Sequence, residues 1–104
     1  MKVIFFDSKV ETFVRQLDEQ TYAKVIHAAE VLEQFGSRIG MPHSKRLQKD
    51  LYELRTQGRP VVRLLYTLHR GDYWLLHGFI KKTEKTPRRE LDIAVRKLQL
   101  LRHR

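Results

Sequence analysis

Hydrophobic and polar residues repeat with two different periods along this chain, and the change of period separates helices from strands. Apolar residues with the spacing of one helix face occur at Val10, Phe13, Val14 and Leu17. This spacing predicts a helix over about residues 9–17, with Ser8 and Glu11 forming a capping box at its start. The preceding apolar run, residues 1–6, ends at a polar pair and is typical of a short buried strand.

A second helix is expected directly after the first. Asp18 can cap it, and helical spacing continues at Tyr22, Val25, Ile26, Ala29, Leu32 and Phe35. Gly36 then supplies the left-handed residue that commonly ends a helix. The two predicted helices form an αα-hairpin, and the segment 37–50, interrupted by Gly40 and Pro42, is expected to be a connecting loop.

The second half of the chain changes to the alternation of β-strands. Strands are predicted over residues 51–55, 61–70 and 73–82, joined by short turns that contain glycine. Three strands joined in this way form an antiparallel meander. A last helix is predicted after them, because Thr86 can cap it and Pro87 suits its first position. Its apolar stripe is Leu91, Ala94, Val95, Leu98 and Leu101.

The order of elements, β-α-α-β-β-β-α, predicts an α+β fold with a small antiparallel sheet and helices packed on one face. The 104 residues suffice for a single domain, 1–104, with one hydrophobic core. The chain contains no cysteine, which excludes a disulfide scaffold, thiolate catalysis and cysteine-ligated zinc. No apolar run is long enough for a membrane span, so the sequence favours a cytoplasmic protein without a membrane partner.

The net charge of +9 is concentrated in one half of the chain. Residues 1–50 hold 8 Lys or Arg and 7 Asp or Glu, whereas residues 51–104 hold 13 and 5. The second half is therefore the candidate surface for a polyanion such as RNA. The five histidines show no metal-ligand spacing, and the sequence contains no phosphate-loop or serine-nucleophile motif, so no metal or cofactor is predicted.

Because alternate residues of a strand share a face, the predicted strands can be sorted by parity. The helix-facing set is expected to be Val62, Leu64, Tyr66, Leu68, Trp74, Leu76, Gly78 and Ile80. The opposite, open face then carries Glu53, Arg55, Arg63, His77, Phe79 and Lys81, with Lys82 and Lys85 at its end. Cations for the phosphate backbone and apolar or aromatic side chains for unstacked bases suit RNA. An ordinary solvated sheet face with cross-strand ion pairs is the alternative.

One reaction on RNA requires no nucleophile from the protein. RNA is cleaved by its own 2′-OH when an enzyme supplies a base, an acid and cations that stabilise the phosphorane. The expected open face holds groups of these kinds. Catalysis without a metal ion is therefore compatible with this composition.

Three stretches of the second half resemble the phage-derived HigB-type branch of the RelE/ParE toxin superfamily. They are residues 51–55, 62–66 and 77–83, followed by Lys85, Thr86, Pro87, Glu90 and Ala94. The resemblance implies a RelE-like fold and the toxin of a type II toxin–antitoxin pair, a ribosome-dependent mRNA endonuclease that inhibits translation. It also implies a cognate antitoxin from an adjacent gene, usually a helix-turn-helix protein of the HigA type, with mRNA and the ribosome as further partners.

Strand position carries the family's site onto this sequence. Arg63 matches the central arginine of RelE-type enzymes, and Lys81 with Lys82 matches a Lys-Arg pair that ends the last strand. Glu53 and Arg55 occupy the places of two lysines, so Glu53 replaces a cation. RelE-type enzymes also use a tyrosine in the C-terminal segment, where this chain has its last predicted helix. The resemblance therefore leaves the acid and the base unassigned.

Catalytic roles are expected for Arg55, Arg63, Lys81, Lys82, His77 and Glu53. The two arginines would hold the scissile phosphate, and either lysine would neutralise developing charge or protonate the leaving 5′ oxygen. Either His77 or Glu53 would accept the 2′-OH proton, although Glu53 could instead orient the arginines through a salt bridge. Contacts with RNA are expected from Lys45, Arg46, Lys85 and Phe79.

Two other functions fit the same composition. ParE-type toxins share the fold but act on DNA gyrase and are not nucleases, and a shared fold does not decide between these activities. A basic nucleic-acid-binding module without catalysis would use the outer face of the last helix, which carries Arg88, Arg89, Arg96 and Lys97.

Overall fold

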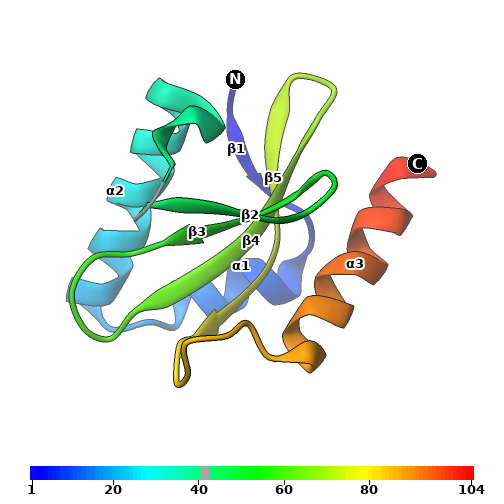
Figure 1. Cartoon of the computed structure of the whole chain (residues 1–104). Coiled ribbons are helices and arrows are strands. Elements are labelled where there is room, and N and C mark those ends of the chain that lie inside the picture. The colour runs from blue at the N-terminus through cyan, green and yellow to red at the C-terminus, as the bar shows by residue number, and fades with distance from the viewer. Residues whose placement is uncertain (41–42) are drawn as a thin grey trace.

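A five-stranded sheet forms the centre of the protein, which a computed structural model describes over residues 1–40 and 43–104 (Figure 1). The strands are β1 (Val3–Phe5), β2 (Ser44–Gln48), β3 (Leu51–Arg55), β4 (Val62–His69) and β5 (Asp72–Ile80). Their order in the sheet is β1-β5-β4-β3-β2. The meander β3-β4-β5 is confirmed. The sheet is mixed rather than antiparallel, because the long connection from β1 returns the chain so that β1 runs parallel to β5.

The helices are α1 (Ser8–Arg15), α2 (Glu19–Phe35) and α3 (Arg88–Arg102), and a short 3₁₀ helix, η1 (Gly36–Ile39), follows α2. Asp18 caps α2 as predicted, its carboxylate accepting the N–H of Thr21 at 2.9 Å. The predicted capping box of α1 is wrong. Asp7 is the N-cap and accepts the N–H of Val10 at 3.0 Å, which makes Ser8 the first residue of the helix.

The helices cover both faces of the sheet, so the prediction that they pack on one face is wrong. Helices α1 and α2 pack on one face, where the buried residues include Val14, Leu32, Leu64 and Tyr66. Helix α3 packs on the opposite face through Ala94, Leu98 and Leu101, against Leu65, Leu76 and Phe79 of the sheet (Figure 1). Both faces of β4 and β5 present apolar side chains, and both must therefore be covered. One consequence is that much of the face expected to be open is interior.

A β-bulge in β5 breaks the parity on which the predicted face assignment depends. Leu65 pairs with His77 and Tyr66 pairs with Leu75, so Leu76 is an extra residue opposite β4. Trp74 and Leu76 therefore pack on the α3 side, whereas Gly78 contacts the ring of Phe13 on the α1 side. Grouping Trp74 and Leu76 with Gly78 and Ile80 is wrong for this reason, since one inserted residue turns the following side chains over.

The segment 37–50, expected to be a loop, contributes strand β2, and the element order therefore has four strands after α2 rather than three. Met41 and Pro42, part of the same expected loop, lie outside the described residues. Ser44 is the buried anchor of β2, its hydroxyl lying 2.7 Å from the hydroxyl of Tyr66. Lys45 and Arg46 are exposed. Burial raises the pKa of Tyr66 to about 12.

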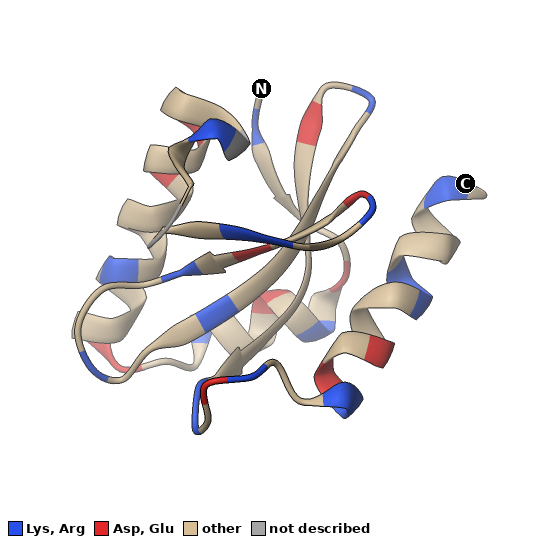
Figure 2. Ribbon diagram, in the orientation of Figure 1, with Lys and Arg blue, Asp and Glu red and all other residues tan. Residues whose placement is uncertain are grey.

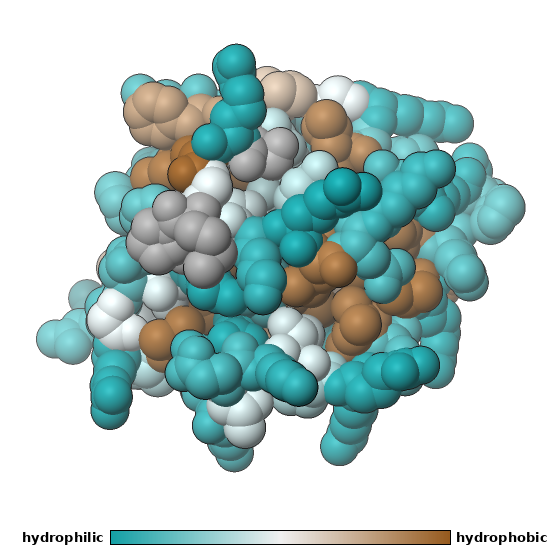
Figure 3. Space-filling model, in the orientation of Figure 1, coloured by the Kyte–Doolittle hydropathy of each residue, from teal (hydrophilic) through white to brown (hydrophobic). Residues whose placement is uncertain are grey.

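In α2 the buried residues are Thr21, Val25, Ala28 and Leu32. Ile26 and Phe35, expected in the core, are exposed. Among the described residues, no helix is long and apolar enough to cross a membrane. In the view of Figure 3, hydrophilic side chains extend over β2 and β3, and apolar side chains gather between these strands and α3.

Candidate functional site

Glu53, in the middle of β3, is a carboxylate with 0% of its surface exposed. Its Oε1 accepts a hydrogen bond from Nε of Arg55 at 2.8 Å, and its Oε2 accepts one from the hydroxyl of Thr86 at 2.7 Å. Nη1 of Arg63 lies 3.6 Å from the same Oε2. We call these four residues the Glu53 cluster. A buried charge is tolerated only when it is paired and hydrogen-bonded, and these contacts meet that requirement.

The sheet register explains why the cluster forms. Arg55 of β3 and Arg63 of β4 are directly opposite each other, and like charges in that position repel. Glu53 lies two residues before Arg55 on the same face, so its two oxygens can approach both guanidinium groups. The structure therefore brings together three of the six predicted catalytic residues, and Glu53 joins the two arginines by salt bridges.

Arg63 is 1% exposed and is incompletely partnered. Its Nη2 donates to the carbonyl oxygen of Glu84 at 2.9 Å. Its Nε and Nη1 are buried and have no hydrogen-bond partner among the described residues. Leaving such donors unsatisfied costs about 1–3 kcal/mol each, so an acceptor that reached them would bind favourably.

A segment without regular secondary structure, residues 81–87, lies over the cluster. The N–H of Lys81 donates to the carbonyl oxygen of Val61 at 2.8 Å, which fixes the start of the segment to the sheet. Glu84 and Thr86 then contact Arg63 and Glu53 as described above. We call residues 81–87 the covering segment, because its Glu84 carbonyl and Thr86 hydroxyl contact Arg63 and Glu53.

Further Lys and Arg residues occur in β2, at the end of β3 and in the covering segment (Figure 2). Lys45 of β2 is directly opposite Glu53 in the sheet and is exposed. The side chains of Arg55 and Lys81 keep 17% and 23% of their surface exposed. Arg46, Lys82 and Lys85 are exposed as well, but Arg46 is opposite Tyr52 and therefore belongs to the other face of the sheet from Lys45 and Glu53. All of the predicted cationic site residues except Arg63 are thus accessible to a polyanion.

Phe79 of β5 is directly opposite Arg63 in the sheet, and His77 lies two residues before it. Nε2 of His77 is 3.3 Å from Oε1 of Glu90 on α3, and the imidazole ring stacks on Phe79 with centroids 6.0 Å apart. Burial lowers the pKa of His77, and the hydrogen bond to Glu90 opposes that effect. Phe79 is buried beneath α3, so its ring is not offered to an RNA base.

Glu84 and Thr86 were not among the residues predicted for the site. Thr86 was expected to cap α3, but Pro87 is the N-cap and the Thr86 hydroxyl bonds Glu53 instead. The contact joins positions 33 residues apart, so no local pattern could indicate it. Glu84 contributes a backbone carbonyl, which every residue type has.

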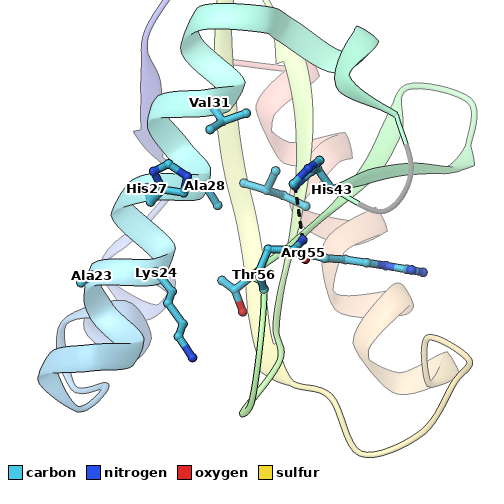
Figure 4. Close-up of a pocket in the computed structure, with 10 residues that line it drawn as sticks. Ala23, Lys24, His27, Ala28, Val31, His43, Arg55 and Thr56 are labelled. Atoms are coloured by element: carbon cyan, nitrogen blue, oxygen red, sulfur yellow. Dashed lines mark hydrogen bonds between the residues drawn. The ribbon is translucent and has the colours of Figure 1, made fainter.

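An apolar pocket of about 240 Å³ lies between α2 and the end of β3 (Figure 4). Ala28, Val31 and Leu54 line it, together with the side chains of His27 and His43. The side chain of Arg55 extends away from this pocket (Figure 4). The pocket therefore adds no group to the Glu53 cluster. Across residues 1–40 and 43–104, no set of three or more His, Asp or Glu side chains is arranged to hold a metal ion.

Residues 12–99 match the family described as phage derived protein Gp49-like (DUF891). No curated protein matches the chain. The family match covers more than half of the chain, including α2, the whole sheet except β1, the covering segment and most of α3. All four residues of the Glu53 cluster fall within it. The chain therefore belongs to the phage-derived Gp49-like family, a family of toxin-like proteins of toxin–antitoxin systems.

Proposed function

We propose that this protein is the toxin of a toxin–antitoxin pair and that it cleaves translated mRNA on the ribosome. The observation that carries the proposal is the Glu53 cluster, in which two arginines and a carboxylate meet at one end of a sheet face. Exposed lysines from β2 and the covering segment lie around that point. This arrangement supplies cations for a phosphate and a carboxylate beside them, as cleavage by the 2′-OH requires.

The reaction transfers a phosphoryl group within the RNA. The 2′ oxygen of one nucleotide attacks the adjacent phosphorus, and the bond from phosphorus to the 5′ oxygen of the next nucleotide breaks. The products are a 2′,3′-cyclic phosphate and a free 5′-OH. One proton leaves the 2′-OH for a base, and one proton reaches the 5′ oxygen from an acid, so the enzyme returns to its starting protonation after both groups exchange protons with water.

Arg55 is the arginine that an RNA phosphate meets first, because its side chain is partly exposed. Movement of the covering segment would free Nη2 of Arg63 from Glu84 and Oε2 of Glu53 from Thr86 at the same time. Arg63 would then hold the phosphate together with Arg55, and Glu53 would accept the 2′-OH proton. The same movement therefore uncovers a phosphate clamp and a base.

Lys81 and Lys82 stand at the end of β5, where the covering segment begins. We assign them the neutralisation of developing charge and the donation of a proton to the leaving 5′ oxygen. Lys45 and Lys85 would contact phosphates on either side of the reacting one. We assign His77 no part in the proton transfers, since its imidazole is held by Glu90 of α3.

Induction of the gene in a bacterium, followed by mapping of mRNA 5′ ends, tests the proposal. Cuts within translated codons are expected for the parent and a loss of cutting for Arg55→Ala and Lys81→Ala. Arg70→Ala, an exposed cation in the turn between β4 and β5, is the matched control and should leave the cuts unchanged. Intact mRNA accompanied by gyrase-dependent DNA damage would contradict RNA cleavage and favour a ParE-type activity.

A further inference from the structure

The outer edge of β5 is only partly occupied. Strand β1 pairs with β5 along Tyr73–Leu75, and the last bond between them runs from the N–H of Phe6 to the carbonyl oxygen of Leu75 at 2.9 Å. Beyond this bond the chain that follows β1 leaves β5 and enters α1, which begins at Ser8. In the described part of the protein, no strand pairs with residues 77–80 on this side.

The backbone groups that face this free edge can be identified from one hydrogen bond. The N–H of Lys81 donates to the carbonyl oxygen of Val61, so Lys81 directs its backbone toward β4. In an antiparallel pair this direction alternates from residue to residue. Gly78 and Ile80 therefore direct their N–H and C=O groups to the free edge. Unpaired groups of this kind are a template for another strand.

A groove runs along that edge between α1 and α3. Two surface hollows of about 540 and 430 Å³ make it up, and both are lined by Phe13 and Gly78. The first continues along β5 to Ile80 and the second continues to His77. Gly78 has no side chain to fill the groove, and a Cβ there would lie 2.7 Å from Cε2 of Phe13. We call this the β5-edge groove.

The rim of the β5-edge groove is strongly basic. Its cations are Lys9, Lys82, Arg89, Arg96 and Lys97, and Glu90 is the one carboxylate among the lining residues. Glu90 is paired with His77, and Lys97 is paired with Asp7 at 3.1 Å. Three cations, Lys9, Arg89 and Arg96, remain exposed on the two flanking helices.

We propose that the β5-edge groove binds an extended, acidic segment of another polypeptide, which pairs with Gly78 and Ile80 as an added strand. Main-chain groups of the segment would satisfy those of β5, alternate side chains would reach the apolar floor, and carboxylates would meet the exposed cations. A second copy of this chain fits poorly, because its own cationic rim would face this one. RNA lacks the alternating N–H and C=O groups that the edge recognises.

The test uses the whole protein and synthetic ten-residue peptides. Isothermal titration measures the affinity for alternating Glu-Val, alternating Lys-Val and a ten-nucleotide oligouridine, and amide hydrogen exchange measures protection of Gly78 and Ile80. We expect the Glu-Val peptide to bind and to protect both amides. Arg89→Glu with Arg96→Glu should weaken it about tenfold or more, which corresponds to about 1.4 kcal/mol. Arg70→Glu, on the distant turn, should not.

The inference is overturned by any of four results: no binding of the Glu-Val peptide, binding without protection of Gly78 and Ile80, equal binding of the Lys-Val peptide, or protection of these amides by oligouridine alone. The inference is also overturned if light scattering detects a dimer of the protein in which the amides of Gly78 and Ile80 are protected without any peptide. None of these measurements involves RNA cleavage, so the groove and the proposed nuclease activity can fail independently. Since Arg89 and Arg96 are exposed, their variants should keep the parent's thermal transition.

Discussion

The carboxylate of Glu53 lies 3.6 Å from Nη1 of Arg63, with 0% and 1% of the two side chains exposed. Glu53 belongs to β3 and Arg63 to β4, so the pair connects neighbouring strands through opposite charges inside the protein. Removing one member leaves the other charge buried and incompletely paired, which is far more costly than the loss of a surface ion pair.

Glu53→Leu should lower the free energy of unfolding by about 3–5 kcal/mol, because Arg63 loses its counter-charge in the interior. Urea denaturation at neutral pH measures it. Glu84→Leu is the control, since the Glu84 side chain is 95% exposed and its change should stay within about 0.5 kcal/mol. Adding Arg63→Met to Glu53→Leu should recover much of the loss. Equal effects of the Glu53 and Glu84 substitutions would contradict the buried pair.

Thr86→Val should destabilise the protein by about 1.5–3 kcal/mol, the range for a hydrogen bond to a charged group. The hydroxyl lost is the donor to Oε2 of Glu53, and valine keeps the shape of threonine. Thr83→Val is matched to it, because the Thr83 hydroxyl bonds the carbonyl oxygen of Lys85 at an exposed position. Amide exchange in residues 81–87 should accelerate in the Thr86 variant alone. Unchanged exchange would show that Thr86 does not hold the covering segment.

Gly78→Ala should cost about 1–3 kcal/mol through overpacking. The added Cβ would lie 2.7 Å from Cε2 of Phe13 and 2.9 Å from Cδ2 of Leu64, both in the α1 side of the core. Phe13→Leu in the same chain removes the nearer obstacle, so the double variant should lose less than the two single losses added together. Thermal unfolding of the four proteins forms the double-mutant cycle. Strict additivity would mean that Phe13 does not limit the space at Gly78.

Protonation of His77 should lower the free energy of unfolding as the pH falls below about 6.5. Burial lowers the pKa of His77 from its ordinary value of 6.5, so the unfolded chain binds more protons than the native protein below that pH. The contribution of His77 to the free energy of unfolding is fully present above pH 6.5 and is lost as the pH falls through the pKa of His77 in the folded protein. Between pH 7.5 and 5.5, the free energy of unfolding should fall less in the His77→Gln variant than in the parent protein. An equal loss in both proteins would assign the pH dependence to other groups.

The elements of this fold were largely predictable because each has a local signal. Asp18 and Gly36 mark the ends of α2, and alternation marks the strands of the meander. Strand β2 lacks such a signal: Ser44, Lys45, Arg46 and Gln48 are polar, and the strand exists because it pairs with β3. Sheet pairing between distant segments is a tertiary effect that local propensity does not contain.

The site was only partly predictable, because its burial also depends on packing between distant segments. Glu53, Arg55 and Arg63 come together as the strand positions indicate. Their burial could not be read from parity, because a helix covers the face that parity left open and the bulge at Leu76 changes which residues of β5 share a face. A bulge depends on the whole sheet and has no distinctive residue here, since leucine is common in regular strands.

Cleavage of one defined mRNA on purified, programmed ribosomes tests the proposed nuclease activity most directly. The mRNA is prepared in two forms, all-ribose and with a single 2′-deoxy nucleotide on the 5′ side of the cut. We expect the parent protein to cut the all-ribose form to a 2′,3′-cyclic phosphate and to leave the 2′-deoxy form intact at that position, and Arg55→Ala to cut neither. Cutting of both forms at equal rates, or of neither by the parent protein, would contradict the proposed activity.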